Sequence, residues 1–508
     1  MSKKFLWGAS ESGFQFEMGD KEGKAADPNT DWFVWVHDKT NIAKKIVSGD
    51  LPENGIDYWH LYKKDHELAK SIGMNAYRIG IEWSRILKDA TNIEVYTKEN
   101  EDTELFDEIV VEEEDMEKLL KLVNNDAVSH YREIIKDLRD KEFKVIVCLN
   151  HFTLPLWIHD PISARDSNLE KGPLGWVDKK TVVEFVKYAS VVGHLFGDLV
   201  DMWATLNEPF VVATIGYLME KEGFPPGVSS PEGFFNVAYN ITNAHVRAYD
   251  ALKKWDTVKA DDDSEAPAYV GLIHNMSPAH PLDPSNEVDV RAAEILDYIL
   301  NRWIINATLK GDVDLDLDFE ISEEEKLSSY RHRLDWFGLN YYTRNVVKKA
   351  ENPLVPGLEI ASFELVEEYG SFCKPNSKSK DNRATTDFGW EIYPEGLREL
   401  LNELSEYDIP IYVTENGIAD ATDRLRPKYL VEHINQLELA IKEDKVKVNG
   451  YFHWALTDNF EWAAGYKMRF GLIEVNLNTK ERILRKSAQI FKEIAENNGL
   501  TEKLKQTI

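Results

Sequence analysis

The sequence predicts an α/β protein built as one (β/α)8 barrel, the TIM-barrel architecture. Eight apolar runs of strand length recur along the chain and alternate with longer amphipathic stretches, which is the pattern of parallel β/α units. No Pro-, Gly- or Ser-rich linker interrupts the 508 residues. We therefore expect residues 1–508 to form a single closed barrel domain rather than two domains.

The predicted strands are short and rich in β-branched and aromatic residues. They cover residues 5–10, 75–83, 144–150, 201–208, 268–276, 335–342, 410–416 and 450–456. Helical segments fill the intervals between them. The clearest is 57–73, where apolar side chains recur at helical spacing and Gly73 ends the run.

Two acidic segments interrupt this alternation. Residues 99–117 carry eleven carboxylates, and we interpret the surrounding region, around 88–125, as an acidic surface insertion. In residues 311–323, five acidic side chains fall at positions one, three, five, seven and twelve of a calcium loop. Position six is Leu317, where such loops need Gly for a sharp turn, so a solvated loop without metal is the favoured interpretation.

Composition excludes several classes of partner. There are 60 Lys and Arg against 89 Asp and Glu, a formal charge of −29, which argues against nucleic acid or an anionic membrane. Neither a signal peptide nor a membrane-spanning run is present, and the two cysteines have no metal-ligand spacing. We therefore expect a cytoplasmic protein. Because the sequence has no HExxH, no Walker loop and no GxGxxG after the first strand, we also expect no cofactor and no metal.

Unusual polar residues gather where the predicted strands end, which in a (β/α)8 barrel is the catalytic face. Arg78 lies within the second strand, where a buried cation is costly without a partner. The residues that follow or end the other strands are Gln15, Asn150, His151, Asn207, Glu208, Asn340, Tyr341, Tyr342, Glu415 and the segment 453–462. Each is weak evidence alone, and their placement on one rim is the signal.

Two glutamates beside an arginine suit the hydrolysis of a glycosidic bond. That reaction needs one protonated carboxyl to assist the leaving oxygen and one ionised carboxylate at the anomeric carbon. Arg78 would hold Glu415 ionised, and Glu208, with less compensation, could keep its proton near neutral pH. The 14 tryptophans also suit a site where flat apolar faces stack on sugar rings.

At these residues the chain resembles the family 1 glycoside hydrolases, retaining β-glycosidases on a (β/α)8 barrel. The resemblance covers nearly the whole chain, and its sequence motifs are most similar to those of the archaeal, thermophilic branch. It is carried by "KFLWGASESGFQFE", "YRIGIEWSRI", "NHFTLPLWIHDP", "TLNEP", "GLNYYT", "VTENG" and "HWALTDNFEWAAGYKMRFGL".

The resemblance implies a role for each matching residue. Glu208 would be the acid/base and Glu415 the nucleophile, with Arg78 and Tyr342 positioning that nucleophile. The groups that would read the sugar hydroxyls are Gln15, His151, Asn207, Glu461 and Trp462, over Trp454 as stacking floor.

The implied substrate is a short β-linked glycoside with a terminal β-D-glucosyl or β-D-galactosyl residue, and sugar transfer is also implied. A β-mannosidase is the alternative. Relatives that accept 6-phosphorylated sugars resemble one another in having Ser, Lys and Tyr where this chain has Glu461, Met468 and Phe470, so a neutral sugar is expected. Members of the archaeal branch that the chain resembles often form tetramers, so we expect a homo-oligomer, either a tetramer or a dimer.

Two rival functions differ in class. A non-catalytic sugar-binding homologue would lose one of the two carboxylates, and this chain keeps both. A sugar-phosphate isomerase would carry a phosphate-binding Gly-rich loop near strands seven and eight, where this chain has "HWALTDNFEW". The sequence leaves open the preferred sugar, the aglycone and the oligomeric state.

Overall fold

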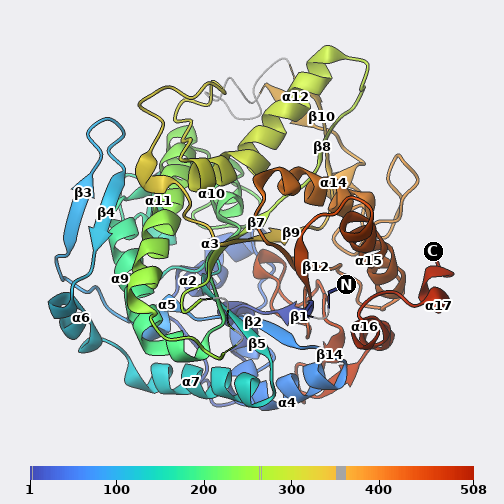
Figure 1. Ribbon diagram of the computed structural model, residues 1–508, viewed down its shortest axis with the longest axis horizontal. Helices are drawn as coiled ribbons and strands as arrows, with labels where there is room; N and C mark the ends of the chain where they lie inside the picture. The colour runs from blue at the N-terminus through green and yellow to red at the C-terminus, as the bar shows by residue number, and fades with distance from the viewer. Residues whose placement is uncertain (3, 263, 265, 351–361) are drawn as a thin grey trace.

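Eight parallel strands close into one barrel, in which each strand pairs with its neighbours in chain order (Figure 1). The computed structural model describes all of the chain except residues 3, 263, 265 and 351–361. The barrel strands are β1 (Leu6–Ser10), β2 (Ala76–Gly80), β5 (Lys144–Asn150), β6 (Met202–Asn207), β7 (Val270–Asn275), β9 (Trp336–Asn340), β12 (Ile411–Asn416) and β13 (Val448–His453). The predicted (β/α)8 barrel is confirmed.

Seven of the eight barrel strands lie within a predicted run, whereas β13 begins at Val448, two residues before the run 450–456. Several runs extend past the end of the strand. The second run was expected to reach Trp83, which instead begins α5 (Trp83–Ile86), and the sixth was expected to include Tyr342, two residues beyond β9. Apolar composition continues beyond some strand ends because side chains there are also buried, as Trp83 is.

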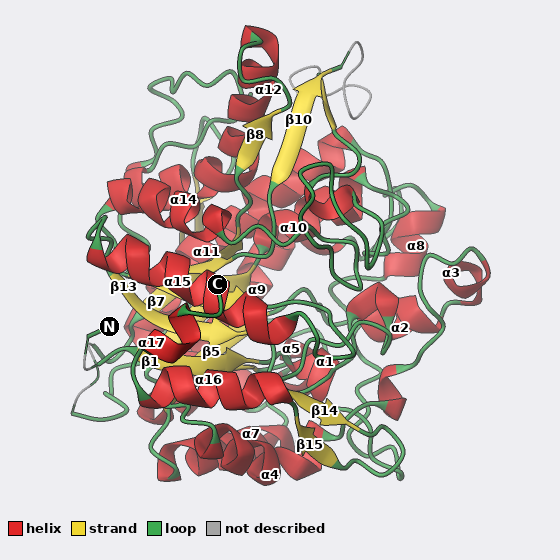
Figure 2. Cartoon of the chain, turned by 90° about the vertical axis from the view of Figure 1, so that its right-hand side faces the viewer, coloured by secondary structure: helices red, strands yellow, loops and turns green. Residues whose placement is uncertain are grey.

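Helices surround the barrel on its outer face (Figures 1 and 2). The longer ones are α4 (Tyr58–Ser71), α7 (Asn125–Asp140), α9 (Lys180–Phe196), α11 (Pro231–Trp255), α12 (Glu287–Asp297), α14 (Glu395–Leu404), α15 (Arg426–Lys442) and α16 (Lys486–Glu496). The shorter ones are α1 (Gly13–Phe16), α2 (Asp31–His37), α3 (Lys39–Ala43), α6 (Glu113–Leu120), α8 (Pro161–Asp166), α10 (Pro209–Leu218), α13 (Trp303–Ile305) and α17 (Glu502–Lys505). Two π-helical turns, η4 (Tyr298–Arg302) and η5 (Asn306–Lys310), flank α13.

Small sheets decorate the barrel. The strands β8 (Ala279–Pro281), β10 (Asn345–Lys349) and β11 (Phe363–Leu365) form one, and β14 (Ile473–Val475) pairs with β15 (Arg482–Leu484). Figures 1 and 2 both show α12, β8 and β10 side by side and displaced from the barrel. Within the described residues, no helix is both long and apolar enough to cross a bilayer.

The acidic segment around 88–125 forms a hairpin followed by a helix. Its strands are β3 (Tyr96–Glu99) and β4 (Phe106–Val110), and α6 follows. All of β3 is exposed, whereas Phe106 and Ile109 of β4 are buried, and the Phe106 backbone N–H donates to Asn243 of α11 at 3.0 Å. One face of the hairpin is therefore packed on the barrel helices.

Helix α4 matches the predicted helix 57–73 and ends before Gly73, whose φ is +83°. It also buries a charge that periodicity did not indicate. Asp65 accepts from Arg482 Nε at 2.8 Å and from Nη2 at 2.9 Å, and both side chains are fully buried. This bidentate pair ties α4 to β15, 417 residues away along the chain.

The loop 311–323 differs from the solvated loop that we expected. Asp314 is fully buried and Leu317 is 4% exposed. The loop packs inward because Asp314 accepts from the Tyr298 hydroxyl at 2.8 Å, and its carbonyl accepts from Trp303 Nε1 at 2.7 Å.

Removing one member of the buried pair should destabilise the fold strongly. We expect Asp65→Ala to lower the free energy of unfolding by about 3–5 kcal/mol, because Arg482 would remain buried without its counter-charge. Urea unfolding monitored by tryptophan fluorescence measures this change. Asp408→Asn, which removes an exposed charge paired with Lys447 and keeps a residue that tolerates the left-handed backbone at this position (φ +47°), is the control and should leave the midpoint unchanged. An equal, small effect of both substitutions would contradict the assignment.

Candidate active site

All ten predicted site residues lie at the carboxyl ends of the barrel strands, because parallel strands all end on the same face. Arg78 is in β2, Asn207 ends β6, Glu208 follows it, and Glu415 is in β12. The others lie on the segments that leave the strands: Gln15, His151, Tyr342, Trp454, Glu461 and Trp462. Eight of the ten are buried, and Tyr342 and Glu461 are partly exposed.

Glu415 is held at both carboxylate oxygens. Arg78 Nη1 donates to Oε1 at 2.7 Å, and the Tyr342 hydroxyl donates to Oε2 at 2.5 Å. Both are charge-assisted bonds, which are shorter and stronger than neutral ones. The carboxylate therefore has a fixed orientation at the end of β12.

Arg78 also contacts two other strand ends. Its Nη2 donates to Asn207 Oδ1 at 2.7 Å and to His151 Nδ1 at 3.1 Å. His151 can accept because burial, and then the Arg78 cation, lower its pKa well below the usual range, which leaves the imidazole neutral. One guanidinium thus joins residues from β2, β6, β12 and the end of β5.

Glu208 occupies a different environment. Its backbone is left-handed, with φ +49°, at the N-terminal cap of α10. Such a conformation is costly for a residue with a side chain, and backbone strain of this kind recurs at functional sites. Asn340 Nδ2 donates to its Oε1 at 2.6 Å, and Asn275 Nδ2 lies 3.5 Å from the same oxygen. Neutral amides, rather than a cation, therefore contact this carboxyl group.

The carboxyl groups of Glu208 and Glu415 differ in the contacts that oppose the pKa increase caused by burial. Burial raises the pKa of both, but Arg78 and the Tyr342 hydroxyl counter this at Glu415. At Glu208, burial and then the charge of Glu415 raise the pKa to about 8, against the weaker opposing effects of Asn340 and Arg78. At neutral pH the site can therefore hold one ionised and one protonated carboxyl.

A third carboxyl lies among aromatic rings. Gln15 Nε2 donates to Asn459 Oδ1 at 3.2 Å and lies 3.5 Å from Glu461 Oε2. Burial, then Glu415 and Glu208, raise the pKa of Glu461 to about 8. The rings of Trp454 and Trp462 lie nearly parallel to that of His151, with centroids 5.8 and 5.9 Å away. Flat apolar faces and hydrogen-bonding groups are thus close together here.

The sequence argument missed three amides that the structure brings into the site. Asn340 was noted at a strand end without a role, yet it contacts Glu208 and also donates to Asn207 Oδ1 at 3.1 Å. Asn275 and Asn459 were not singled out. The available signal was position, since Asn275 ends β7 and Asn459 follows β13, but asparagine near a strand end is also ordinary turn chemistry.

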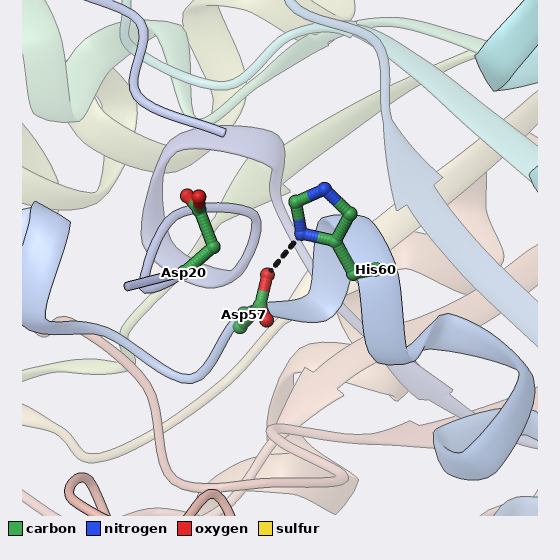
Figure 3. A group of neighbouring side chains, drawn as sticks. All are labelled: Asp20, Asp57 and His60. Carbon is green, nitrogen blue, oxygen red and sulfur yellow. Dashed lines mark hydrogen bonds and ion pairs between the residues drawn. The ribbon is translucent and has the colours of Figure 1, made fainter. Parts of the chain in front are cut away.

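A possible metal-binding triad lies apart from these residues. Asp20, Asp57 and His60 have ligand atoms within 4.8 Å of one another (Figure 3). His60 Nδ1 is already 2.7 Å from Asp57 Oδ1, and the two oxygens of Asp20 accept the backbone N–H groups of Lys24 and Ala25 at 2.8 Å. These atoms have partners within the chain, and none of the three side chains has a buried atom without a hydrogen-bond partner in the described residues, so the triad gives no reason to invoke a metal.

Comparison with known proteins places this geometry in a family. The family model described as glycosyl hydrolase family 1 matches residues 1–108 and 120–500. The chain belongs to glycosyl hydrolase family 1. This family 1 enzyme is therefore an O-glycosyl hydrolase, as the resemblance implied.

Its relatives match over their whole length. A β-galactosidase of Pyrococcus woesei is 51% identical, covering 100% of this chain and 99% of the relative. Among solved structures, the β-glycosidase of Thermosphaera aggregans has a TM-score of 0.89 at 39% identity, covering 100% and 98%. The β-glucosidase of Pyrococcus furiosus has a TM-score of 0.87 at 41% identity, covering 99% and 97%.

The Arg78 cation lowers the pKa of Glu415 and, more weakly, that of Glu208. For this glycosyl hydrolase, Arg78→Met should raise both values, so both limbs of the pH profile of kcat/KM should move to higher pH. We also expect kcat/KM to fall by at least about 10²-fold. Arg78→Lys keeps the charge and serves as the control, with a smaller displacement. An unmoved acidic limb in a folded Arg78→Met enzyme would contradict this electrostatic role.

Proposed function

We propose that the enzyme hydrolyses terminal β-D-glucosyl and β-D-galactosyl residues of short glycosides with retention of configuration. The observation that carries this proposal is the unequal treatment of two buried carboxyl groups. Glu415 is bonded to a cation and a hydroxyl, and Glu208 is bonded to amides with a pKa near 8. Glycosidases need this pair, one ionised carboxylate and one protonated acid, and the retaining course, with Glu415 as nucleophile, is what the family resemblance implies.

In the first step, a Glu415 oxygen attacks the anomeric carbon while the bond to the leaving oxygen breaks. Glu208 gives its proton to that oxygen, and a covalent glycosyl-enzyme remains. In the second step, the ionised Glu208 takes a proton from water, the water oxygen attacks the anomeric carbon, and Glu415 is released. An alcohol in place of water would give sugar transfer by the same route.

We propose that Gln15, His151, Asn207 and Glu461 read the sugar hydroxyls over Trp454 and Trp462. The raised pKa of Glu461 alters one argument from sequence: a protonated Glu461 repels a 6-phosphate less than an anion would. The preference for a neutral sugar then depends more on Met468 and Phe470, which offer a phosphate no charge.

The relatives support glucosides and galactosides over the mannoside alternative, since β-galactosidases and β-glucosidases are among them. One similar structure is a β-glucosidase mutant derived from a hyperthermophilic tetrameric structure. We accordingly propose a homo-oligomer, tetramer or dimer, and a heat-adapted enzyme. A cytoplasmic location stays a prediction.

The stereochemical course tests the proposal directly. Proton NMR of the first-formed sugar should show the β-anomer, because two displacements at one carbon restore its configuration. A 2-deoxy-2-fluoro β-glucoside should inactivate the enzyme slowly, with the label on Glu415 in the peptide digest. An α-anomer appearing first, or a label on another residue, would refute the assignment.

Removing the proposed acid should discriminate between leaving groups. Glu208→Ala should lower kcat for poor leaving groups by about 10²–10⁴-fold while sparing activated aryl glycosides in the first step, since only the former need a proton. Azide should then restore turnover of the activated glycosides and yield a β-glycosyl azide. The wild-type enzyme with azide is the control. Equal losses on all aglycones without rescue would mean that Glu208 is structural.

A further inference from the structure

A second cluster of carboxylates lies in the loop between η5 and β9, apart from the active-site carboxyls. Asp314, Asp316 and Glu325 each offer a carboxylate oxygen, and these oxygens lie within 4.8 Å of one another. Asp314 and Asp316 are two of the residues that match the spacing of a calcium loop. The third member is Glu325 rather than Glu323, which is exposed and paired with Lys326 at 2.6 Å.

Asp314 is the member that points to a ligand. Its side chain is fully buried. Oδ2 accepts from the Tyr298 hydroxyl at 2.8 Å and from the Phe319 backbone N–H at 3.1 Å, but Oδ1 has no hydrogen-bond partner in the described part of the chain. A buried carboxylate oxygen without a donor is costly, and a bound cation is one way to satisfy it.

The loop backbone makes the sharp turn that the missing glycine at position six argued against. Leu317 stands at the glycine position of the calcium-loop pattern, and its φ is +57°, in the left-handed region that glycine would occupy. For a leucine this conformation costs about 1–2 kcal/mol. Burial of the Leu317 side chain holds it there, so the chain makes the required turn without glycine.

The charges in this loop are not balanced by the protein. Within the described ranges, no Lys, Arg or His nitrogen lies within 4.0 Å of a carboxylate oxygen of Asp314, Asp316 or Glu325. Burial, and also the charge of Glu325, raise the pKa of Asp314, although the Tyr298 hydroxyl and nearby backbone N–H groups oppose this. Some buried carboxylates elsewhere in the molecule do have a basic partner, as Asp65 has Arg482.

We propose that Asp314, Asp316 and Glu325 bind a calcium ion. The donor set is all oxygen, which excludes the soft and imidazole-dependent sites of zinc or copper. It is carried by an irregular loop, and calcium accepts variable geometry with six to eight oxygens, whereas magnesium demands a near-ideal octahedron. Backbone carbonyls and water would complete the coordination.

The ion would stabilise the segment that supports the catalytic rim. The Asp314 carbonyl accepts from Trp303 Nε1, and the Trp303 ring lies 5.5 Å from that of Phe210. Phe210 is in the first turn of α10, two residues after Glu208. We therefore expect calcium to raise thermal stability through η4 and α13, and no reaction step depends on it.

Terbium(III) luminescence tests the site in the full-length protein. Terbium binds the same oxygen ligands as calcium, and Tyr298 and Trp303 are close enough to Asp314 to sensitise its emission. Chelator-treated enzyme should bind terbium with sensitised emission that calcium displaces. Calcium at about a hundred-fold excess over Kd should also raise the thermal midpoint by a few degrees.

Three variants make the result specific. Asp314→Asn and Asp316→Asn should each weaken terbium binding at least about tenfold and abolish the calcium-dependent rise in midpoint, because each removes a charged ligand. Asp316 is exposed and its amide could still accept from the Asp318 N–H, so this variant should fold even if Asp314→Asn does not. Asp318→Asn makes the same charge change in the same loop and should behave as wild type.

Three outcomes would overturn the proposal. The first is no sensitised emission and no effect of calcium on the midpoint, which would mean that Asp314 is protonated instead. The second is an equal loss of binding in Asp318→Asn, which would indicate diffuse attraction to an acidic surface. The third is binding that disappears only in Asp57→Asn, which would place the ion at the Asp20, Asp57 and His60 triad.

Discussion

The buried guanidinium of Arg78 is the constraint on which the active-site geometry depends. A fully buried cation is tolerated only when its N–H groups are satisfied and its charge is balanced. The two terminal nitrogens of Arg78 meet this requirement, with Glu415, Asn207 and His151 within 3.1 Å, whereas its Nε has no hydrogen-bond partner among the described residues. These contacts hold four strand ends in fixed positions relative to one another, which makes the mouth of the barrel rigid.

The asymmetry between the two carboxyl groups follows from the same arrangement. Asn207 Oδ1 accepts from Arg78 and also from Asn340, and Asn340 donates in turn to Glu208. A chain of hydrogen bonds thus connects the two glutamates, but only Glu415 receives the cation directly. Similar burial with unequal compensation is what separates their proton affinities.

Buried acids elsewhere in the molecule are accommodated in different ways. Asp65 and Glu415 each have a fully buried arginine, whereas burial raises the pKa of Glu11, which has no ion pair in the described part of the chain. The Asp314 cluster likewise has no basic partner among the described residues. A basic side chain can balance a buried carboxylate only where folding brings the two close together. At this loop we infer that a calcium ion from solvent balances the charge instead.

The sequence by itself determined the barrel and singled out the two glutamates as candidate catalytic residues, since strand runs, helix stops and strand-end polar residues are local signals. The tertiary structure decided which groups meet. Arg78 and Glu415 are 337 residues apart, and their contact exists only because the barrel closes. For the same reason the role of Asn340, the burial of Asp65 and the left-handed turn at Leu317 could not be predicted: each depends on a partner or a packing surface that is distant in sequence.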